Sequence, residues 1–164
     1  MADGKLKKDL AAEIQDFVKK DFTPQYGKMQ EVFELSAGWQ SLRELGTQLW
    51  LDTGNIEDIQ KNWTQEFSAV TTNNTLLNKE IQTGQYDSLI KEAAELLNSY
   101  EDLDEKQWKL EMAFILNAYH ALRLVEKFDA YVSVEEHTDL AFDPELAVEY
   151  ALRYYEICTD RFIV

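Results

Sequence analysis

The sequence predicts an α/β protein whose short strands run parallel and are separated by helices. Four short apolar, β-prone segments lie at residues 49–51, 67–70, 130–134 and 161–164, with helix-forming stretches between them. This alternation is typical of parallel strands buried on both faces. The pattern fits two architectures, an open doubly wound sheet and part of an eight-stranded barrel. A nucleotide-binding sheet is less favoured, because neither GxGxxG nor GxxxxGK[ST] follows the first strand.

Helices are expected before the first strand. Residues 5–20 carry apolar side chains at helical spacing and predict an amphipathic helix. A second, short helix is expected over residues 29–35, ending at 36–38. Helix is then expected to restart at Ser41, because Ser41 and Glu44 have the spacing of a capping box.

Helices are also expected between the strands, where the hydrophobic periodicity changes to that of a helix. They are predicted at residues 56–63, at 75–97 with an interruption near Gly84, at 104–128, and from Pro144 onward. Proline at the start of the last segment is in its favoured first-turn position. The final segment, RFIV, is expected to be a fourth strand.

The composition disfavours nucleic-acid and membrane partners. The formal net charge of −15 repels phosphate backbones and anionic lipid.

The single cysteine, Cys158, cannot form an internal disulfide and is expected to be a buried structural thiol. No apolar stretch has signal-peptide or membrane-spanning character, so a cytoplasmic protein is expected.

Polar side chains follow three of the predicted strands. Asp52 ends the first strand, Thr71 and Asn73 follow the second, and Glu135 follows the third. In a parallel barrel these strand ends open onto one face, which holds the active site. Each residue also has a simpler interpretation as a helix cap or turn residue. Their joint occurrence favours a functional site.

Neither histidine predicts a catalytic or metal site. His120 lies within the apolar stretch FILNAYHALRLV and is expected to be a core or helix-surface residue. His137 follows Glu135 and Glu136, but one histidine with adjacent carboxylates gives no convincing ligand geometry.

From the first strand onward the chain resembles the transaldolase family. The segments LRELGTQLWLDTGN, FSAVTTNNTLLNKEI, AYVSVEEHTDLAFD and DRFIV follow one another in that family's order. The resemblance covers residues 41–164, and residues 1–40 are interpreted as an N-terminal helical extension. It implies a parallel (β/α) TIM-barrel type of α/β fold, of which this chain carries the first four strands only.

The resemblance also implies an activity, the transfer of a dihydroxyacetone unit between sugar phosphates through a lysine Schiff base, in the pentose phosphate pathway. Asp52 would exchange protons with a substrate hydroxyl during carbon–carbon bond cleavage. Glu135 would move protons through a water during Schiff-base formation. Asn73 would hydrogen-bond the dihydroxyacetone unit, and Thr71 matches a nearby polar position. Such chemistry needs no separate cofactor and no metal.

Three departures from the family pattern bear on this expectation. The family usually has proline where this chain has Asn74. Glu136 and His137 replace a more apolar segment, which affects the expected substrate preference. The family's reactive lysine would directly follow Val164, and its phosphate-binding cations lie later still. The chain alone is therefore expected to be inactive.

Two other interpretations stay open. The chain could be a truncated, non-catalytic half-barrel that associates through exposed edge strands, either as a homo-oligomer or with the missing half-barrel. It could also belong to a related Schiff-base aldolase on a similar scaffold, because fold does not fix function. Sugar phosphates are the expected small-molecule partners.

Overall fold

The computed structural model describes residues 2–23 and 32–164, and side chains from Asp9 onward. A parallel sheet contains β1 (Leu49–Asp52), β2 (Phe67–Thr71), β3 (Tyr131–Ser133) and β4 (Phe162–Ile163), in the spatial order β1-β2-β3-β4. All four predicted strands are therefore confirmed. A doubly wound sheet reverses direction at a switch point, whereas this order is sequential. The sheet is consistent with part of a barrel of parallel strands.

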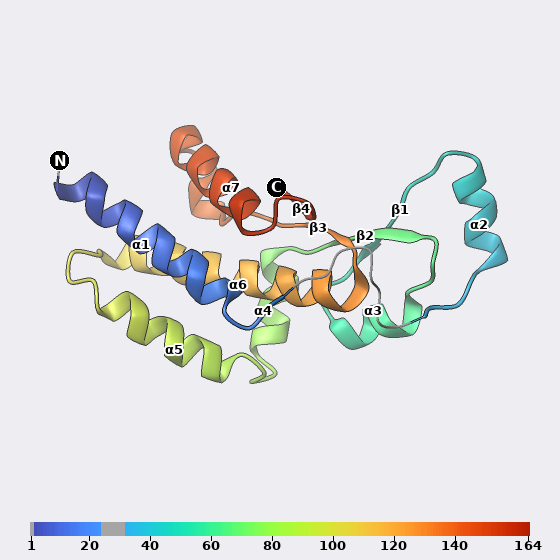
Figure 1. Ribbon diagram of the computed structural model, residues 1–164, viewed down its shortest axis with the longest axis horizontal. Helices are drawn as coiled ribbons and strands as arrows, with labels where there is room; N and C mark the ends of the chain where they lie inside the picture. Colours follow the sequence, from blue (N-terminus) through green and yellow to red (C-terminus); the bar gives the residue numbers. More distant parts are fainter. Residues whose placement is uncertain (1, 24–31) are drawn as a thin grey trace.

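Helices precede and connect the strands, and most lie on one side of the sheet (Figure 1). They are α1 (Ala2–Lys19), α2 (Ala37–Glu44), α3 (Ile56–Asn62), α4 (Asn74–Ile81), α5 (Asp87–Asn98), α6 (Glu105–Phe128), the 3-10 turn η1 (Thr138–Leu140) and α7 (Pro144–Ile157). The predicted interruption near Gly84 is confirmed by the break between α4 and α5. Asp104 caps α6 and Asp143 caps α7, each with a side-chain oxygen that accepts a backbone N–H.

The register separates a covered and an open face of the sheet. The row Leu51, Val70, Val132 and Phe162 runs across the four strands. Its last three members are buried and belong to the hydrophobic core. Side chains alternate along a strand, so the neighbouring rows point the other way. They include Trp50, Tyr131 and Ile163, which are 41%, 43% and 37% exposed. The second face is therefore partly exposed within the described part of the chain.

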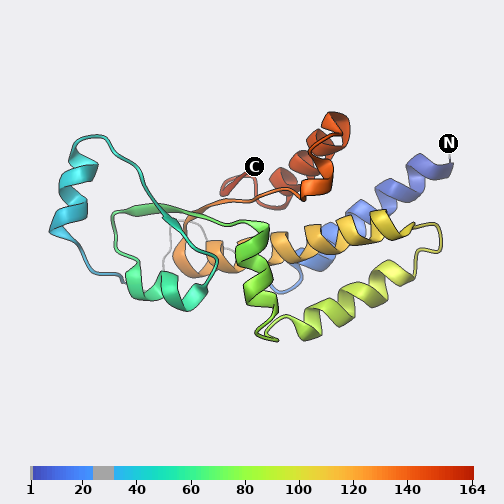
Figure 2. The ribbon, with the colours of Figure 1, turned by 180° about the vertical axis from the view of Figure 1, so that it is seen from behind.

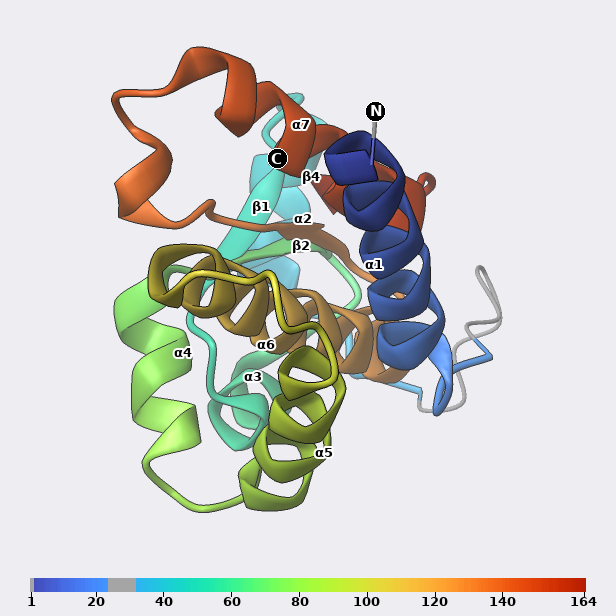
Figure 3. The ribbon, with the colours of Figure 1, turned by 90° about the vertical axis from the view of Figure 1, so that its left-hand side faces the viewer.

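Helix α6 is the centre of the helical layer. Fourteen of its residues are buried, and it packs against α1, α4, α5, α7 and β3. Figure 2 shows α5 beside α6, and Figure 3 shows α3, α4, α5 and α6 on one side of the sheet. This explains the apolar periodicity of residues 104–128, because a central helix must be apolar on several sides.

Helix α1 packs on α6 and α7 and shares their hydrophobic core. Its residues Leu10, Ile14 and Val18 are buried. The side chains of Gln15 and Lys19 donate to the backbone oxygen of Glu156 at the end of α7, at 3.1 and 3.0 Å. The extension expected for residues 1–40 is thus joined to the α/β part by apolar burial and hydrogen bonds.

The helix expected at residues 29–35 is wrong in its described portion, residues 32–35. The helix expected from Ser41 to Glu44 is present, but it starts four residues earlier than predicted. Residues 32–36 are not helical, and α2 instead begins at Ala37 and ends at Glu44. Residues 29–31 lie outside the described residues. The N–H of Ser36 is held by the carboxylate of Glu66, at 3.1 and 3.2 Å, which fixes the chain at the start of α2. Glu66 comes from a distant segment, so local spacing did not reveal this start.

None of the described helices combines the length and the apolar character needed to cross a membrane. Cys158 is buried at the end of α7, as expected of a structural thiol.

Candidate active site

Asp52 and Thr71 are direct neighbours at the carboxyl ends of β1 and β2. They are paired in the sheet register, and Thr71 Oγ1 donates to Asp52 Oδ1 over 2.6 Å. The same row continues to Ser133 on β3 and Ile163 on β4. Because paired residues in parallel strands point to the same face, these side chains lie on the open face of the sheet. The carboxylate of Asp52 is exposed there and oriented by the hydroxyl of Thr71.

The turn after Asp52 is anchored to the helices below it. Asn55 Oδ1 accepts from the N–H of Asp58 at 2.8 Å and caps α3, while Asn55 Nδ2 donates to the buried Glu80 on α4 at 2.8 Å. Gly54 is buried in the same turn. A Cβ atom at Gly54 would lie 3.2 Å from Leu76 Cβ, so the close approach of the turn to α4 favours glycine. These contacts fix the loop that follows the Asp52 carboxylate.

Asn73 lies at the N-cap of α4. Its Oδ1 accepts from the N–H of Leu76 at 2.9 Å, which is the capping interpretation considered for this residue. The amide Nδ2 takes no part in this cap. A capping role and a substrate-binding role are therefore compatible, because they use different atoms of the same side chain.

Glu135 lies just beyond β3 and contacts the start of α4. Its Oε2 accepts from the backbone N–H of Asn74 at 2.9 Å and from Asn74 Nδ2 at 3.1 Å. Asn74 Nδ2 also donates to the backbone oxygen of Glu136 at 3.0 Å. On its other side, Asn74 Oδ1 accepts from the buried Asn117 of α6 at 3.2 Å. The structure thus brings Glu135 to the residue next to Asn73 in the chain.

An open groove of about 760 Å³ runs beside Glu135, between the segment after β3 and helix α7. Thr72, Ser133 and Glu135 contribute to one side, and apolar residues of α7 to the other. Glu136 also lines this groove, and burial raises the pKa of its carboxyl above the usual range. His137 accepts from the N–H of Asp139 at 3.2 Å and caps the η1 turn, so its contacts are local.

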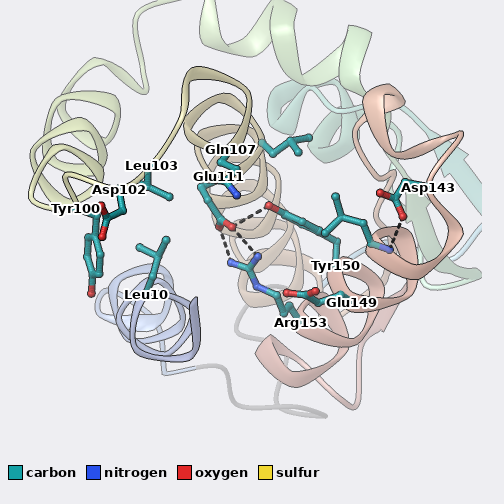
Figure 4. A pocket seen from close by; sticks show the side chains of 12 residues that line it. Leu10, Tyr100, Asp102, Leu103, Gln107, Glu111, Asp143, Glu149, Tyr150 and Arg153 are labelled. Atoms are coloured by element: carbon teal, nitrogen blue, oxygen red, sulfur yellow. Dashed lines mark hydrogen bonds and ion pairs between the residues drawn. The ribbon is translucent and has the colours of Figure 1, made fainter. Parts of the chain in front are cut away.

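A second hollow of about 290 Å³ lies away from the strand ends, between α1, α6 and α7 (Figure 4). Within it, Glu111 accepts two hydrogen bonds from Arg153, at 2.8 and 2.5 Å, and one from Tyr150 at 2.8 Å. These groups satisfy one another, so the cluster is explained as a structural ion pair that joins α6 to α7.

Among the described side chains, those of residues 9–23 and 32–164, no group of three or more histidine, cysteine, aspartate or glutamate residues is placed to hold a metal ion. His120, which the sequence placed in the core or on a helix surface, is buried on α6.

Sequence reasoning missed two residues that shape this region. Ser133 shares the register row of Asp52 and Thr71, and its strand position was the available signal. Asn74 was noted only as a departure from a family pattern. Its contacts with Glu135 and Asn117 span 61 and 43 residues, and no local pattern reports them.

A model of the family described as transaldolase/fructose-6-phosphate aldolase matches residues 49–164, from the first residue of β1 through β4. The match covers more than half of the chain and includes Asp52, Thr71, Asn73 and Glu135. A search of curated proteins gives no match.

Proposed function

The chain belongs to the transaldolase/fructose-6-phosphate aldolase family, and from this we propose that the full-length protein transfers a dihydroxyacetone unit between sugar phosphates through a lysine Schiff base. In this reaction a lysine amine condenses with the carbonyl of a ketose phosphate to form an imine. The imine then accepts the electrons of the breaking carbon–carbon bond. We also propose that the protein acts in the pentose phosphate pathway, as the family resemblance implies.

The observation that carries this proposal is the Thr71–Asp52 hydrogen bond on the open face of the sheet. Retro-aldol cleavage requires a base that removes a proton from the substrate hydroxyl being oxidised. Thr71 occupies Oδ1 of Asp52 and so leaves Oδ2 to accept that proton. Asp52 acts as this base, and Thr71 holds its carboxylate in one orientation.

Glu135 and Asn73 are assigned the roles implied by the family resemblance. Glu135 moves protons to and from a water during imine formation and hydrolysis, and Asn73 binds the dihydroxyacetone unit through its amide. Both lie two residues beyond the row that contains Thr71 and Ser133, just past the carboxyl ends of β2 and β3.

The position of the reactive lysine follows from the alternation of side chains along a strand. Ile163 lies in the row of Asp52, Thr71 and Ser133. A residue two positions beyond Ile163 would return to the open face. A lysine directly after Val164 would therefore point toward the strand ends that carry the carboxylates.

Borohydride trapping tests the proposal. Protein that carries the family's reactive lysine should gain the mass of one reduced adduct when incubated with fructose 6-phosphate and borohydride. The resemblance implies that peptide mapping places this adduct on a lysine directly after Val164. No adduct, or an adduct on another lysine, would end the proposal. A variant of that lysine to methionine is the matched control.

The match to a family that includes fructose-6-phosphate aldolase supports a second candidate, cleavage without transfer. The two reactions share the imine and differ in whether its three-carbon unit is passed to an aldose phosphate or released. Turnover of fructose 6-phosphate that depends on an added aldose phosphate indicates transfer. Turnover at an equal rate without an acceptor, with release of dihydroxyacetone, indicates the aldolase.

One observation supports the alternative of an interaction protein. The open face of the sheet exposes the apolar side chains of Trp50, Tyr131 and Ile163, and exposed apolar patches often mark protein–protein contacts. Light scattering on residues 1–164 separates the possibilities. Self-association that is lost in the Trp50→Glu and Tyr131→Glu double variant favours this alternative. A monomer at all concentrations opposes a homo-oligomer.

A further inference from the structure

We propose that Asn74 is a positioning residue that holds the carboxylate of Glu135 in place for proton transfer, and that it acts only through Glu135. The inference rests on the proposed function, because it assumes that Glu135 moves protons in the reaction. It adds a residue for which the family resemblance implied no role.

Asn74 lies between the buried Asn117 of helix α6 and the segment after β3 that carries Glu135. Asn117 Nδ2 donates to Ala113 O of its own helix at 3.1 Å and to Asn74 Oδ1 at 3.2 Å. Asn117 is 3% exposed on α6, the central helix of the helical layer. The Asn74 amide therefore receives its orientation from the core. That orientation directs Nδ2 toward Glu135 Oε2 and the Glu136 oxygen.

Two donors of Asn74 converge on the same oxygen of Glu135. The backbone N–H contributes at 2.9 Å and the side-chain amide at 3.1 Å. Glu135 itself is exposed and lies in a segment without strand or helix pairing, so its side chain has little packing to restrict it. Hydrogen bonds to Oε2 leave Oε1 as the atom for a water or substrate. The two hydrogen bonds therefore hold the Glu135 side chain in one rotamer, with Oε1 as the atom that can accept a proton.

Asparagine is not required at this position by the helix. Asn74 is the first residue of α4, where proline is favoured because its missing N–H has no partner within the helix. The preceding residue, Asn73, has φ −147° and ψ 167°, an extended conformation that tolerates a following proline. Proline would thus preserve α4 while removing both donors to Glu135. Compared with proline, asparagine at position 74 adds the side-chain hydrogen bonds with Glu135 and Asn117.

The test is a graded series in the full-length protein. Asn74→Ala removes the side-chain donor and keeps the backbone N–H, whereas Asn74→Pro removes both. Each hydrogen bond to a charged group corresponds to about a factor of 10 in rate. We therefore expect kcat to fall about 10-fold in Asn74→Ala and about 100-fold in Asn74→Pro. KM for fructose 6-phosphate should stay within about 2-fold, since Asn74 does not bind the substrate. Asn78→Ala, an exposed asparagine on the same helix, is the control and should keep wild-type kcat.

A double-variant cycle shows whether Asn74 acts through Glu135. Adding Asn74→Pro to Glu135→Gln should cause no further loss of kcat, because the carboxylate to be positioned is gone. An equal additional loss in that background overturns the inference, as does wild-type kcat in Asn74→Pro. The thermal midpoint of each variant identifies unfolding as a cause. If Asn74→Pro unfolds, Asn74→Ala carries the same cycle.

The two proposals fail in different ways. If Glu135→Gln keeps wild-type turnover, the role of Glu135 in the proposed function is wrong. If Glu135→Gln loses turnover and neither Asn74 variant does, only the role of Asn74 is wrong.

Discussion

Thr71 and Asp52 form a hydrogen bond of 2.6 Å across the carboxyl ends of two adjacent parallel strands. The bond joins a β-branched side chain with restricted rotamers to an exposed carboxylate. It therefore restricts the carboxylate without burying it. This combination suits a group that must meet a substrate from solvent in a defined orientation.

We expect Thr71→Val to lower kcat of the full-length protein by about 10-fold, because it removes a hydrogen bond to a charged group while keeping the side-chain shape. Thr71→Ser retains the hydroxyl and should recover most of the activity. Thr75→Val, on the exposed side of α4, is the matched control. The measurement is turnover of fructose 6-phosphate. Asp52→Asn should cause a larger loss than Thr71→Val, and the reverse order would contradict the assignment of Asp52 as base.

Asn73 allows its two roles to be separated. Asn73→Ala should lower the free energy of unfolding by about 1 kcal/mol, because the N-cap of α4 is lost. Asn73→Ser keeps a capping oxygen but lacks the amide, so it should retain stability and still raise KM for fructose 6-phosphate. Denaturant unfolding and steady-state kinetics on the same preparations check both. Unchanged KM in both variants would leave Asn73 as a cap alone.

How far the sequence predicted this structure depends on the range of the interactions. The four strands follow from short apolar runs, α6 follows from apolar periodicity, and the start of α7 follows from Pro144 in the first turn. These signals are local, because neighbouring residues in the chain determine them. The strand order is not local, and the pattern of alternating strands and helices fitted both a doubly wound sheet and a barrel. In the structure the strands pair in the order β1-β2-β3-β4, which favours part of a barrel over a doubly wound sheet.

The sequence could not predict the start of α2 or the environment of Glu135, because both depend on contacts between distant segments. Ser36 is fixed by Glu66, and Glu135 by Asn74, over separations of 30 and 61 residues. In each case a polar group on one segment satisfies a donor on another. A single sequence records the residue types but not which of them meet. The strand-end position of Asp52, by contrast, was sufficient to predict the edge of the sheet on which it lies.

The Glu111–Arg153 ion pair should matter for stability and not for catalysis. Both side chains are largely buried, at 10% and 12% exposed, so removal of one partner leaves an uncompensated buried charge. We expect Glu111→Gln to lower the free energy of unfolding by about 3 kcal/mol. The exposed Lys109–Glu105 pair of the same helix is the control, and Lys109→Ala should leave the denaturation midpoint nearly unchanged. A Glu111→Leu and Arg153→Met double variant should recover stability relative to Glu111→Gln, because no lone charge stays buried. Equal effects of Glu111→Gln and Lys109→Ala would contradict this account.

His120 should make stability depend on pH below neutrality. Tyr86 Oη lies 2.6 Å from His120 Nδ1 and accepts from Arg123 at 2.9 Å. Burial, with a contribution from the nearby Arg123 charge, lowers the pKa of His120 to about 4.

The sign of this pH effect follows from proton uptake. In the unfolded chain His120 takes up a proton as the pH falls through about 6.5, whereas the folded protein resists it down to about pH 4. The unfolded state therefore binds more protons between these values, and the free energy of unfolding falls as pH is lowered through that window. Above pH 7 this residue should contribute no pH dependence. The shift corresponds to about 3 kcal/mol between pH 7 and pH 4.

His120→Gln should be less stable at pH 7 but should lose this part of the dependence of the unfolding free energy on pH, while His137→Gln should retain it. Urea unfolding at several pH values measures the difference between wild type and variant, which cancels the titration of the many carboxylates common to both. Parallel stability curves for wild type and His120→Gln would show that the buried imidazole takes up its proton as readily in the folded state as in the unfolded one.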